Sequence, residues 1–256
     1  PKAHIHLPFR LTLAAEEARH ASRVLRLEVG AEVELFALDQ EHSLRAIVVS
    51  ITGERCEVEV VEQLPSPRLP DVTLLAAVVK PAQSDFICEK AAELGLKSVH
   101  FFFAERSQHP LRGERLREKL ERLQRVRDAA LKQSHSPRCT SVFLHPDFST
   151  ALDHLHLAAQ KPKETRLLCS VPGTEQPPEI TSFFPVQSFS PTSLENSPRP
   201  VETYIAVGPE GGFTSSELEL ALQHGYRTAK LGSTTLRSET AAVLASGLCM
   251  LLTGLN

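Results

Sequence analysis

The sequence lacks the features that mark several common classes of protein. No apolar run approaches the roughly 20 residues that span a bilayer, and the first thirteen residues contain neither an apolar h-region nor a small-residue cleavage site. The five cysteines are scattered without a C-x-x-C pair, which favours reduced thiols over a disulfide framework or a zinc site. We therefore expect a cytoplasmic protein with no membrane segment and no bound metal.

Motifs of the commonest nucleotide-binding enzymes and hydrolases are also missing. The chain has no G-x-G-x-x-G fingerprint, no Walker A loop and no G-x-S-x-G elbow. Their absence argues against an NAD enzyme, a P-loop NTPase or a serine hydrolase. The hydrophobic content of 41% and the charged content of 23% are ordinary for a globular protein, so we expect a packed core.

Charge is distributed unevenly along the chain. The net charge of −3 does not mark a nucleic-acid binder, but residues 105–138 carry ten Lys and Arg against five Asp and Glu. Ten minus five leaves a local excess of five positive charges, and electrostatic footprints are local. This stretch is therefore a candidate nucleic-acid surface, with a solvated helix face as the alternative for its middle residues 115–127.

Two regions of different periodicity are separated by a proline-rich segment. Residues 1–66 contain a helical stretch and three short Val- and Ile-rich segments, which predict a small β-barrel domain. The segment at 64–70 has three prolines in seven residues, which indicates a linker. Residues 71–256 alternate between apolar strands and amphipathic helices, so we expect a second domain with a mostly parallel sheet. Within it, residues 172–200 are rich in Pro and Ser and are predicted to be an irregular insertion.

A regular succession of elements is expected in the second region. Continuous apolar runs predict buried strands, and an apolar stripe at helical spacing predicts a helix packed on one face. The strands are expected at 71–79, 98–105, 166–171, 203–208 and 228–232, and the helices at 84–95, 114–133, 215–225 and 238–252. Gly95 is well suited to end the first of these helices.

A glycine-rich loop follows one of the predicted strands. GPEGGFTSSE at 208–217 comes directly after the strand at 203–208 and opens a helix. Three glycines in five residues leave backbone amides unshielded, and the spacing of Thr214 and Glu217 predicts a capping box. Because ligands of α/β sheets bind at the carboxyl ends of strands, this is a candidate ligand loop. A glycine-rich turn without a ligand is the alternative.

A second loop, LGSTTLRSETAA at 231–242, also leaves a strand and enters a helix. Ser238 is placed to cap that helix, and Glu239 favours the positive end of its dipole. Arg237 and Glu239 are candidate functional residues at the same sheet edge, with a surface arginine and a plain helix-dipole residue as the alternative. The following helix is apolar almost all round, so we expect it to be buried against the sheet or a second subunit.

Several motifs in register resemble one known family. They are Lys80 and Lys90 with the ELG run at 93–95, ERS at 105–107, AALKQSHSPR at 129–138, GPEGGF at 208–213 and LGSTTLRSETA at 231–241. Together they resemble the RsmE family of SPOUT-class 16S ribosomal RNA methyltransferases, which methylate N3 of a uridine. The run at 20–36 resembles that family's PUA-like RNA-binding domain. The match spans nearly the whole chain in the right order.

The resemblance implies a fold, a cofactor and partners. The fold would be α/β, a PUA-like β-barrel followed by a SPOUT methyltransferase domain with a C-terminal trefoil knot. The cofactor would be S-adenosyl-L-methionine, and the partners would be 16S ribosomal RNA or the small ribosomal subunit and a second copy of the chain, in a homodimer that shares its active sites. The implied cofactor contacts are Ser170, Gly208, Glu210, Gly211, Gly212, Leu231, Gly232, Leu236 and Arg237.

The same resemblance suggests roles for charged residues. We hypothesise that Arg237 stabilises charge on the uracil and that Glu239 orients it or acts as the base. The implied RNA contacts near the site are Arg106, Gln133 and Arg138. Further RNA contacts are expected in the N-terminal domain, at Arg10, Arg23 and Arg26.

The chain departs from the family pattern around its last loop. Thr234 and Thr235 stand where the family has an arginine and an aliphatic residue, and RTET has become RSET. The segment after the strand at 166–171 also lacks the usual short acidic stretch. These changes leave open a non-catalytic RNA-binding or assembly protein that has kept the fold. A SPOUT methyltransferase of different specificity, such as a ribose 2′-O enzyme, is a further alternative.

Overall fold

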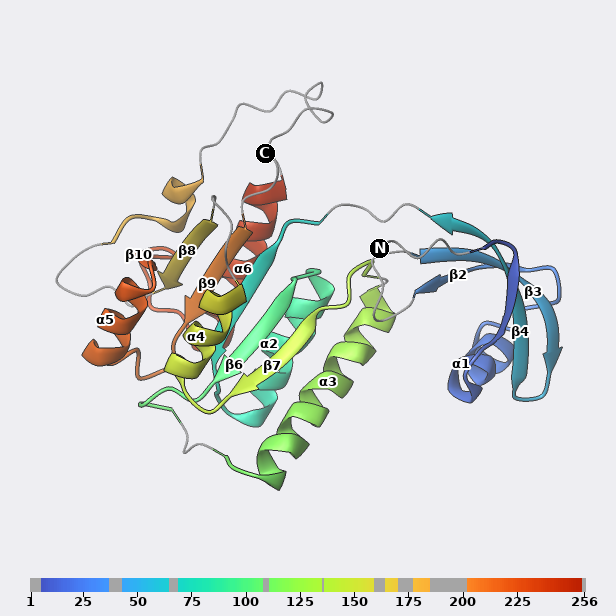
Figure 1. Cartoon of the computed structure of the whole chain (residues 1–256), viewed down its shortest axis with the longest axis horizontal. Coiled ribbons are helices and arrows are strands. Elements are labelled where there is room, and N and C mark those ends of the chain that lie inside the picture. Colours follow the sequence, from blue (N-terminus) through green and yellow to red (C-terminus); the bar gives the residue numbers. More distant parts are fainter. Residues whose placement is uncertain are drawn as a thin grey trace, which may run out of the picture. The chain divides into compact units, whose positions relative to one another are not determined.

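The chain divides between Arg68 and Leu69 into two units in the computed structural model (Figure 1). The structure describes residues 6–36, 43–64, 69–107, 111–134, 136–158, 164–169, 177–184 and 202–254. Among the helices of these ranges, none is long and apolar enough to cross a membrane.

The first unit is built on a four-stranded antiparallel sheet. Its elements are β1 (Phe9–Thr12), α1 (Ala15–Arg19), the π-helical turn η1 (His20–Val24), β2 (Glu32–Phe36), β3 (Ser43–Thr52) and β4 (Arg55–Leu64), in sheet order β1-β4-β3-β2. Along β4, Cys56, Val58 and Val60 are buried, as the two-residue period of a strand requires. They pack with Ala18 of α1 and Ala21 of η1. The sheet is compatible with the expected barrel, which stays a prediction.

The second unit contains a six-stranded parallel sheet in the order β10-β8-β9-β5-β6-β7. Its strands are β5 (Val72–Ala77), β6 (Ser98–Phe102), β7 (Ser141–His145), β8 (Glu164–Cys169), β9 (Glu202–Val207) and β10 (Arg227–Ala229). Its helices are α2 (Pro81–Glu93), α3 (Glu114–Ser134), α4 (Phe148–Ala158), the 3-10 turn η2 (Ile180–Phe183), α5 (Ser215–Gln223) and α6 (Ser238–Gly254). The α/β fold with a parallel sheet is therefore confirmed.

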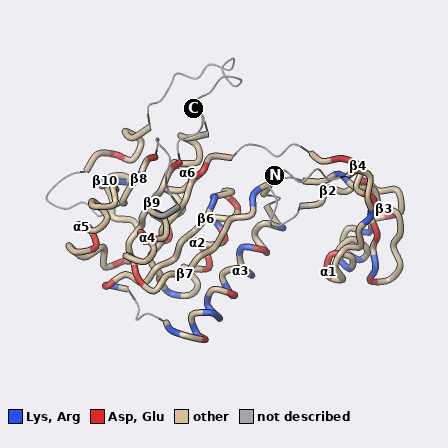
Figure 2. Tube along the Cα trace, in the orientation of Figure 1, with Lys and Arg blue, Asp and Glu red and all other residues tan. Residues whose placement is uncertain are grey.

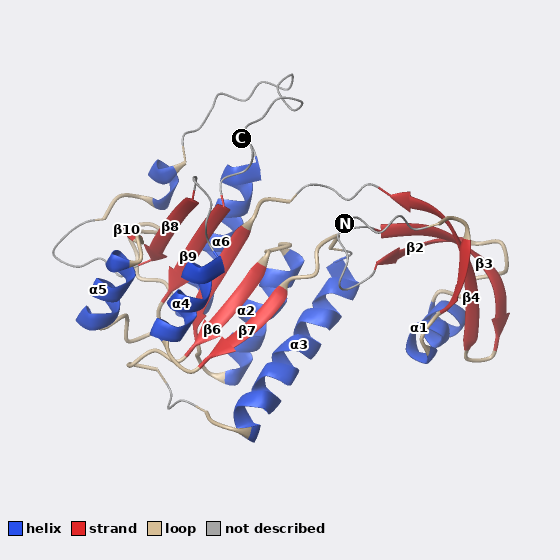
Figure 3. Ribbon diagram, in the orientation of Figure 1, coloured by secondary structure: helices blue, strands red, loops and turns tan. Residues whose placement is uncertain are grey.

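Helices cover both faces of this sheet (Figure 3). One apolar cluster joins α2, α3 and α6 to one face, and a second joins α4 and α5 to the other. The central strands β5 and β9 are buried along their whole length, which explains their continuous apolar sequences. Gly95 ends α2 with a positive φ of 70°, as its position predicts.

The structure adds elements that the sequence analysis does not predict. Strand β1, strand β7 and helix α4 are unexpected, so the parallel sheet has six strands where five are predicted. The described part of the insertion, residues 177–184, is also ordered against the core. Ile180 and Phe184 are buried there, which corrects the prediction that this stretch is irregular throughout.

A chain of buried hydrogen bonds lies on the sheet face that α4 covers. Thr73 Oγ1 and Ser98 Oγ lie 3.1 Å apart, Ser98 Oγ lies 3.1 Å from His100 Nε2, and His100 Nδ1 lies 3.0 Å from His145 Nε2. Burial, with the neighbouring His145 and His154, lowers the pKa of His100 to about 3. Burial, with His154, lowers the pKa of His145 to about 4. Both rings are therefore neutral at pH 7.

Candidate functional site

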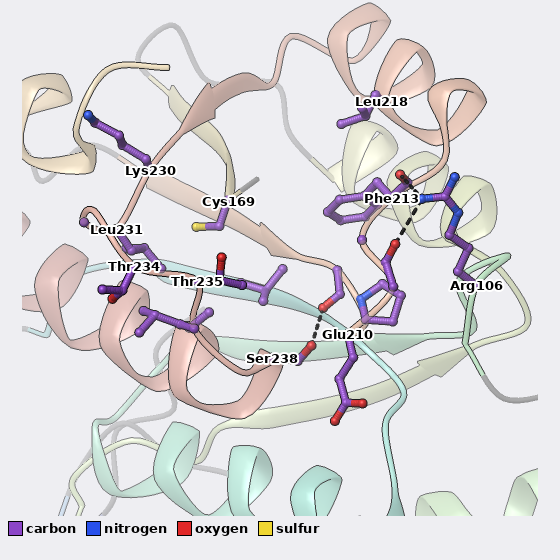
Figure 4. Close-up of a pocket in the computed structure, with 18 residues that line it drawn as sticks. Arg106, Cys169, Glu210, Phe213, Leu218, Lys230, Leu231, Thr234, Thr235 and Ser238 are labelled. Carbon is purple, nitrogen blue, oxygen red and sulfur yellow. Dashed lines mark hydrogen bonds between the residues drawn. The ribbon is translucent and has the colours of Figure 1, made fainter. Parts of the chain in front are cut away.

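A cavity of about 410 Å³ opens where β8, β9 and β10 end. This volume falls in the range of small-molecule sites. The loops that follow β9 and β10 form opposite walls, and Cys169, the last residue of β8, lies between them (Figure 4). The carboxyl ends of parallel strands meet at one sheet edge, which is where ligands of α/β proteins bind.

The loop after β9, residues 208–214, is fixed by contacts on several sides. Phe213 is buried, and its ring lies 5.1 Å from that of Phe148 and 6.2 Å from that of Phe102, between ring centres. The predicted capping box is confirmed, because Thr214 Oγ1 accepts from the amide of Glu217 and Glu217 Oε2 accepts from the amide of Thr214. The loop's geometry is therefore set by the protein itself.

Glycine is required at particular points of the cavity wall. Gly212 has a φ of 70° and Gly232 a φ of 139°, a region that side-chain-bearing residues rarely adopt. At both positions the space that a Cβ would occupy is open. A ligand can therefore approach the backbone of both loops closely.

The two loops are tied to each other by Ser238. Its hydroxyl donates a 2.8 Å hydrogen bond to the carbonyl of Gly208. The sequence predicts that Ser238 caps α6, but Ser238 is the first residue of that helix, and the carbonyl of Arg237 accepts from the amide of Ala241 instead. The hydroxyl therefore joins two loops rather than completing one helix.

The described part of the insertion supports the second loop. Lys230 donates its amide to the carbonyl of Pro178 at 3.0 Å, and its own carbonyl accepts from the amide of Ile180 at 2.9 Å. The Lys230 ammonium pairs with Glu179 at 3.3 Å. Residues 178–180 thus run parallel to the chain around Lys230, where the second loop of the cavity wall begins.

Cys169 contributes a thiol to the cavity wall. Burial raises the pKa of this thiol to about 12, so it stays protonated at neutral pH. Thiols react as thiolates, and a protonated thiol is a poor nucleophile. Cys169 therefore acts as a small apolar surface here.

Most of the predicted cofactor residues meet in this cavity. Gly208, Glu210, Gly211, Gly212, Leu231, Gly232 and Leu236 all line it. Arg237 is exposed and lies outside the cavity wall, and Ser170 lies outside the described residues. Thr234 and Thr235, where the chain departs from the family pattern, both line the cavity. The binding role of these residues stays a prediction.

The candidate catalytic pair is adjacent but not joined. Within the described chain, no hydrogen bond or salt bridge connects Arg237 to Glu239, so the expected orientation of Arg237 by Glu239 is not formed in this structure. The Oε2 atom of Glu239 is buried and has no hydrogen-bond partner among the described residues. A buried acceptor without a donor is costly and needs an explanation. Glu239 is therefore poised to accept a donor that the described part of the chain does not supply.

The predicted RNA contacts near the site lie in different places. Arg106 lines the cavity, where its Nη1 donates to the carbonyl of Gly211 at 3.0 Å. Arg138 is half-buried at the other end of the strands, because it precedes β7. It donates to the carbonyls of Leu69 and Pro70, which precede β5. Gln133 is exposed in the last turn of α3. One chain therefore does not bring these three residues together.

Other predicted RNA contacts are exposed. Arg10, Arg23 and Arg26 lie on the surface of the first unit, and Arg10 pairs with Glu59 at 3.0 Å. Lys and Arg residues recur along α3 (Figure 2). In the described chain the α3 arginines at 115, 117 and 125 are exposed without a salt-bridge partner, whereas Arg122 pairs with Asp85.

The sequence analysis overlooks part of the cavity wall. Cys169, Phe213 and Lys230 line it but are not among the predicted cofactor residues. Each is next to a predicted cofactor residue in the sequence, namely Ser170, Gly212 or Leu231. Extending the predicted set by one residue on either side would have found all three.

Comparison with known proteins places most of the chain in one group. Residues 66–250 match the model of a family described as an RNA methyltransferase domain. The chain is 29% identical over 237 residues to the ribosomal RNA small subunit methyltransferase E of Aquifex aeolicus, a match that covers 91% of this chain and 90% of that protein.

Two solved structures are similar over almost the full length. A probable rRNA-methyltransferase from Porphyromonas gingivalis has a TM-score of 0.74 at 26% identity, covering 95% of this chain and 93% of that one. A ribosomal RNA small subunit methyltransferase E from Neisseria gonorrhoeae, bound to S-adenosyl methionine, also has a TM-score of 0.74. It is 22% identical and covers 97% of this chain and 94% of its own, a likeness of fold.

Proposed function

The chain belongs to the RNA methyltransferase family, and from that premise we propose that it methylates N3 of a uridine in 16S ribosomal RNA with S-adenosylmethionine. The observation that carries this proposal is the cavity between the loops at 208–214 and 230–236, in a chain that matches small-subunit rRNA methyltransferases over nine-tenths of its length. The motif resemblance supplies the N3 position. The enzyme would act in the cytoplasm.

The cavity fits the proposed cofactor. Its 410 Å³ can accommodate a nucleoside with an amino-acid arm. Gly212 and Gly232 leave open space beside their backbone for a ligand, and Leu231 and Leu236 add apolar surface for a purine ring. The glycines lie on both loops, so a bound cofactor would touch both. When bound, S-adenosylmethionine supplies the methyl group as an electrophilic sulfonium.

The chain must also expose and deprotonate the base. Extruding a base from a stack costs a few kcal/mol, and uridine N3 carries a proton at neutral pH. We infer that Glu239 accepts this proton, because its buried Oε2 has no hydrogen-bond partner among the described residues. Loss of the proton places negative charge on the uracil carbonyl oxygens. The exposed guanidinium of Arg237 would stabilise that charge.

RNA binding would rest on the exposed arginines of helix α3, within the basic stretch at 105–138. Exposed α3 arginines at 115, 117 and 125 have no salt-bridge partner in the described chain and are available to phosphates. Each phosphate contact releases counterions, so RNA affinity should fall steeply as salt rises. A salt-independent affinity would exclude these arginines as the RNA-binding surface.

We propose a homodimer because one chain separates a predicted RNA contact, Arg138, from the cavity. Arg138 lies beside the residues that precede β5, at the amino ends of the strands, whereas the cavity lies at their carboxyl ends. Helix α6 borders the cavity at Ala241 and exposes Leu244 and Leu251, two turns apart on one face. A second copy packed on this face would cover the leucines and add its own residues to the site.

Two finer features of the fold are also proposed. The family resemblance implies a trefoil knot in the C-terminal part. In the sheet β9 lies between β8 and β5, and such a non-sequential strand order is compatible with a knot. The antiparallel sheet of the first unit supports a PUA-like RNA-binding role for residues 1–66. Removing residues 1–66 should then weaken RNA binding and leave cofactor binding unchanged.

Two measurements test the proposed function. Calorimetry should detect S-adenosylmethionine binding to the purified protein, and mass spectrometry should find 3-methyluridine missing from the 16S RNA of a deletion strain. RNA binding without cofactor binding would instead favour a non-catalytic protein with this fold, an alternative supported by Thr234 and Thr235 in the cavity wall. A missing ribose 2′-O-methyl group would indicate a different specificity. Arg237→Ala with unchanged turnover would rule out the role given to Arg237.

A further inference from the structure

Side-chain contacts in both directions connect the segment after β6 to the loop after β9. Strands β6 and β9 are not neighbours, because β5 lies between them in the sheet. The connecting segments are residues 104–107 on one side and residues 208–217 on the other. Arg106 reaches from the first to the second, and Glu217 reaches back from the second to the first. We call this pair of contacts the loop brace.

Arg106 forms one half of the loop brace. Its Nη1 donates to the carbonyl of Gly211 at 3.0 Å and to that of Phe213 at 3.5 Å, as Figure 4 shows. A Cβ on Gly211 would lie 3.2 Å from the Cβ of Arg106, so the two backbones approach closely. Charge-assisted hydrogen bonds from a planar guanidinium fix the direction of the carbonyls that they contact.

Glu217 forms the other half. Glu217 is 5% exposed. Its carboxylate accepts hydrogen bonds from two backbone amides. Oε1 accepts from the amide of Glu105 at 3.0 Å, and Oε2 accepts from the amide of Thr214 at 2.8 Å. Ser216 Oγ adds a 3.2 Å bond to the carboxylate of Glu105. The start of α5 and the segment at 104–107 are thereby one rigid unit.

We propose that Arg106 is a positioning residue for cofactor binding, which holds the glycine loop at 208–213 in its binding geometry before the cofactor arrives. This rests on the proposed function, because it assumes that S-adenosylmethionine occupies the cavity. Glycine loops lose much conformational freedom on ordering, and a loop ordered in advance binds its ligand more tightly. The role differs from the RNA contact that the motif resemblance implies for Arg106.

Cofactor titration separates the two roles. Arg106→Met keeps an unbranched stem but removes the guanidinium donors, and we expect the dissociation constant for S-adenosylmethionine to rise about tenfold. Arg106→Lys keeps one donor group and should recover part of the loss. Arg55→Met is the matched control, since Arg55 is exposed and makes one 3.0 Å side-chain bond, to Glu57 in the first unit.

Kinetics give a second readout. The KM for the cofactor should rise in Arg106→Met, while kcat at saturating cofactor and the affinity for 16S RNA fragments should stay as in the wild type. The melting temperature should also be unchanged, because Arg106 is an exposed residue. The opposite pattern, weaker RNA binding with unaltered cofactor affinity, would overturn the proposal in favour of an RNA contact.

Hydrogen exchange distinguishes failure of this proposal from failure of the proposed function. In the absence of cofactor, the amides of residues 208–213 should exchange faster in Arg106→Met than in the wild type. If the wild type does not bind S-adenosylmethionine, the proposed function fails, but this comparison still tests the loop brace. Equal exchange in the two proteins would show that Arg106 does not hold the loop.

Discussion

The two walls of the cavity differ in how the protein supports them. The loop at 208–214 is fixed by the loop brace, by the capping box at Thr214 and by the buried ring of Phe213. The loop at 231–236 is anchored just outside its ends, through Lys230 on one side and Ser238 on the other. Within the described chain, residues 231–235 make no hydrogen bond of their own.

This difference indicates a division of roles between the loops. The loop at 208–214 is preformed, so a ligand that binds there loses little free energy in ordering it. Residues 233–235 are exposed and make no hydrogen bond with the described residues, so they can adapt to what enters the cavity. We infer that the first loop determines affinity and that the second closes around the ligand.

Lowering the pH should change the stability most, because it protonates His100 and His145 in the parallel sheet that carries both loops. The folded state lowers the pKa of His100 to about 3 and that of His145 to about 4, so between pH 6.5 and 4 the unfolded chain binds more protons. Stability should therefore fall as pH falls through this window, by about 1.4 kcal/mol per pH unit for each proton. Urea unfolding from pH 7 to 5 measures the slope. His145→Gln should reduce it, and a flat profile would show that both histidines titrate normally.

Phe213→Ala is the strongest single test of the preformed loop. The ring is buried against Phe148, so its loss should lower the free energy of unfolding by about 3 kcal/mol. Cofactor binding should weaken as well, because the loop loses its apolar anchor. Calorimetry and urea unfolding measure the two effects. Phe213→Leu, which keeps apolar volume, is the control and should lose less of both.

Ser238→Ala breaks the connection between the two loops. The buried carbonyl of Gly208 would lose its donor, which should cost about 1 kcal/mol and weaken cofactor binding about fivefold. Ser233→Ala is the matched control, because Ser233 is exposed and does not line the cavity. If both variants bind equally well, the loops function independently of each other.

Glu179→Gln should have the smallest effect. It removes a partly exposed ion pair with Lys230, and such pairs contribute less than about 1 kcal/mol. Backbone bonds between residues 178–180 and Lys230 remain, so cofactor affinity should change less than about twofold. A larger loss, measured by the same titration, would mean that the second loop depends on this side chain more than its backbone contacts suggest.

Local sequence patterns predicted much of the fold. Strand β5 and helix α3 are found within two residues of their predicted ends, because burial of an apolar run and an apolar stripe at helical spacing are local signals. Strand β7 is short and only partly buried, so its local pattern is weak. Helix α4 does carry an apolar stripe at helical spacing, formed by Phe148, Ala151, Leu152 and Leu155, and could have been predicted from it.

The candidate site was predicted less completely. The glycine loops were found because they follow buried strands, and the Thr214 capping box follows from a spacing of three residues. The bonds of Ser238 to Gly208 and of Arg106 to Gly211 join residues 30 and 105 positions apart. No local rule encodes such contacts. The sequence therefore indicated a helix cap at Ser238 where the structure has a bond between two loops, and it gave no sign of the bond from Arg106 to Gly211.

The thiol of Cys169 has a consequence for chemical self-protection. A sulfonium methyl donor alkylates any competent nucleophile within reach, and a thiolate in the wall of its binding site would compete with the RNA base. Burial raises the pKa of Cys169 to about 12, so the thiolate is scarce at neutral pH. Because burial keeps the Cys169 thiol protonated, the enzyme would not methylate this residue of its own cavity wall.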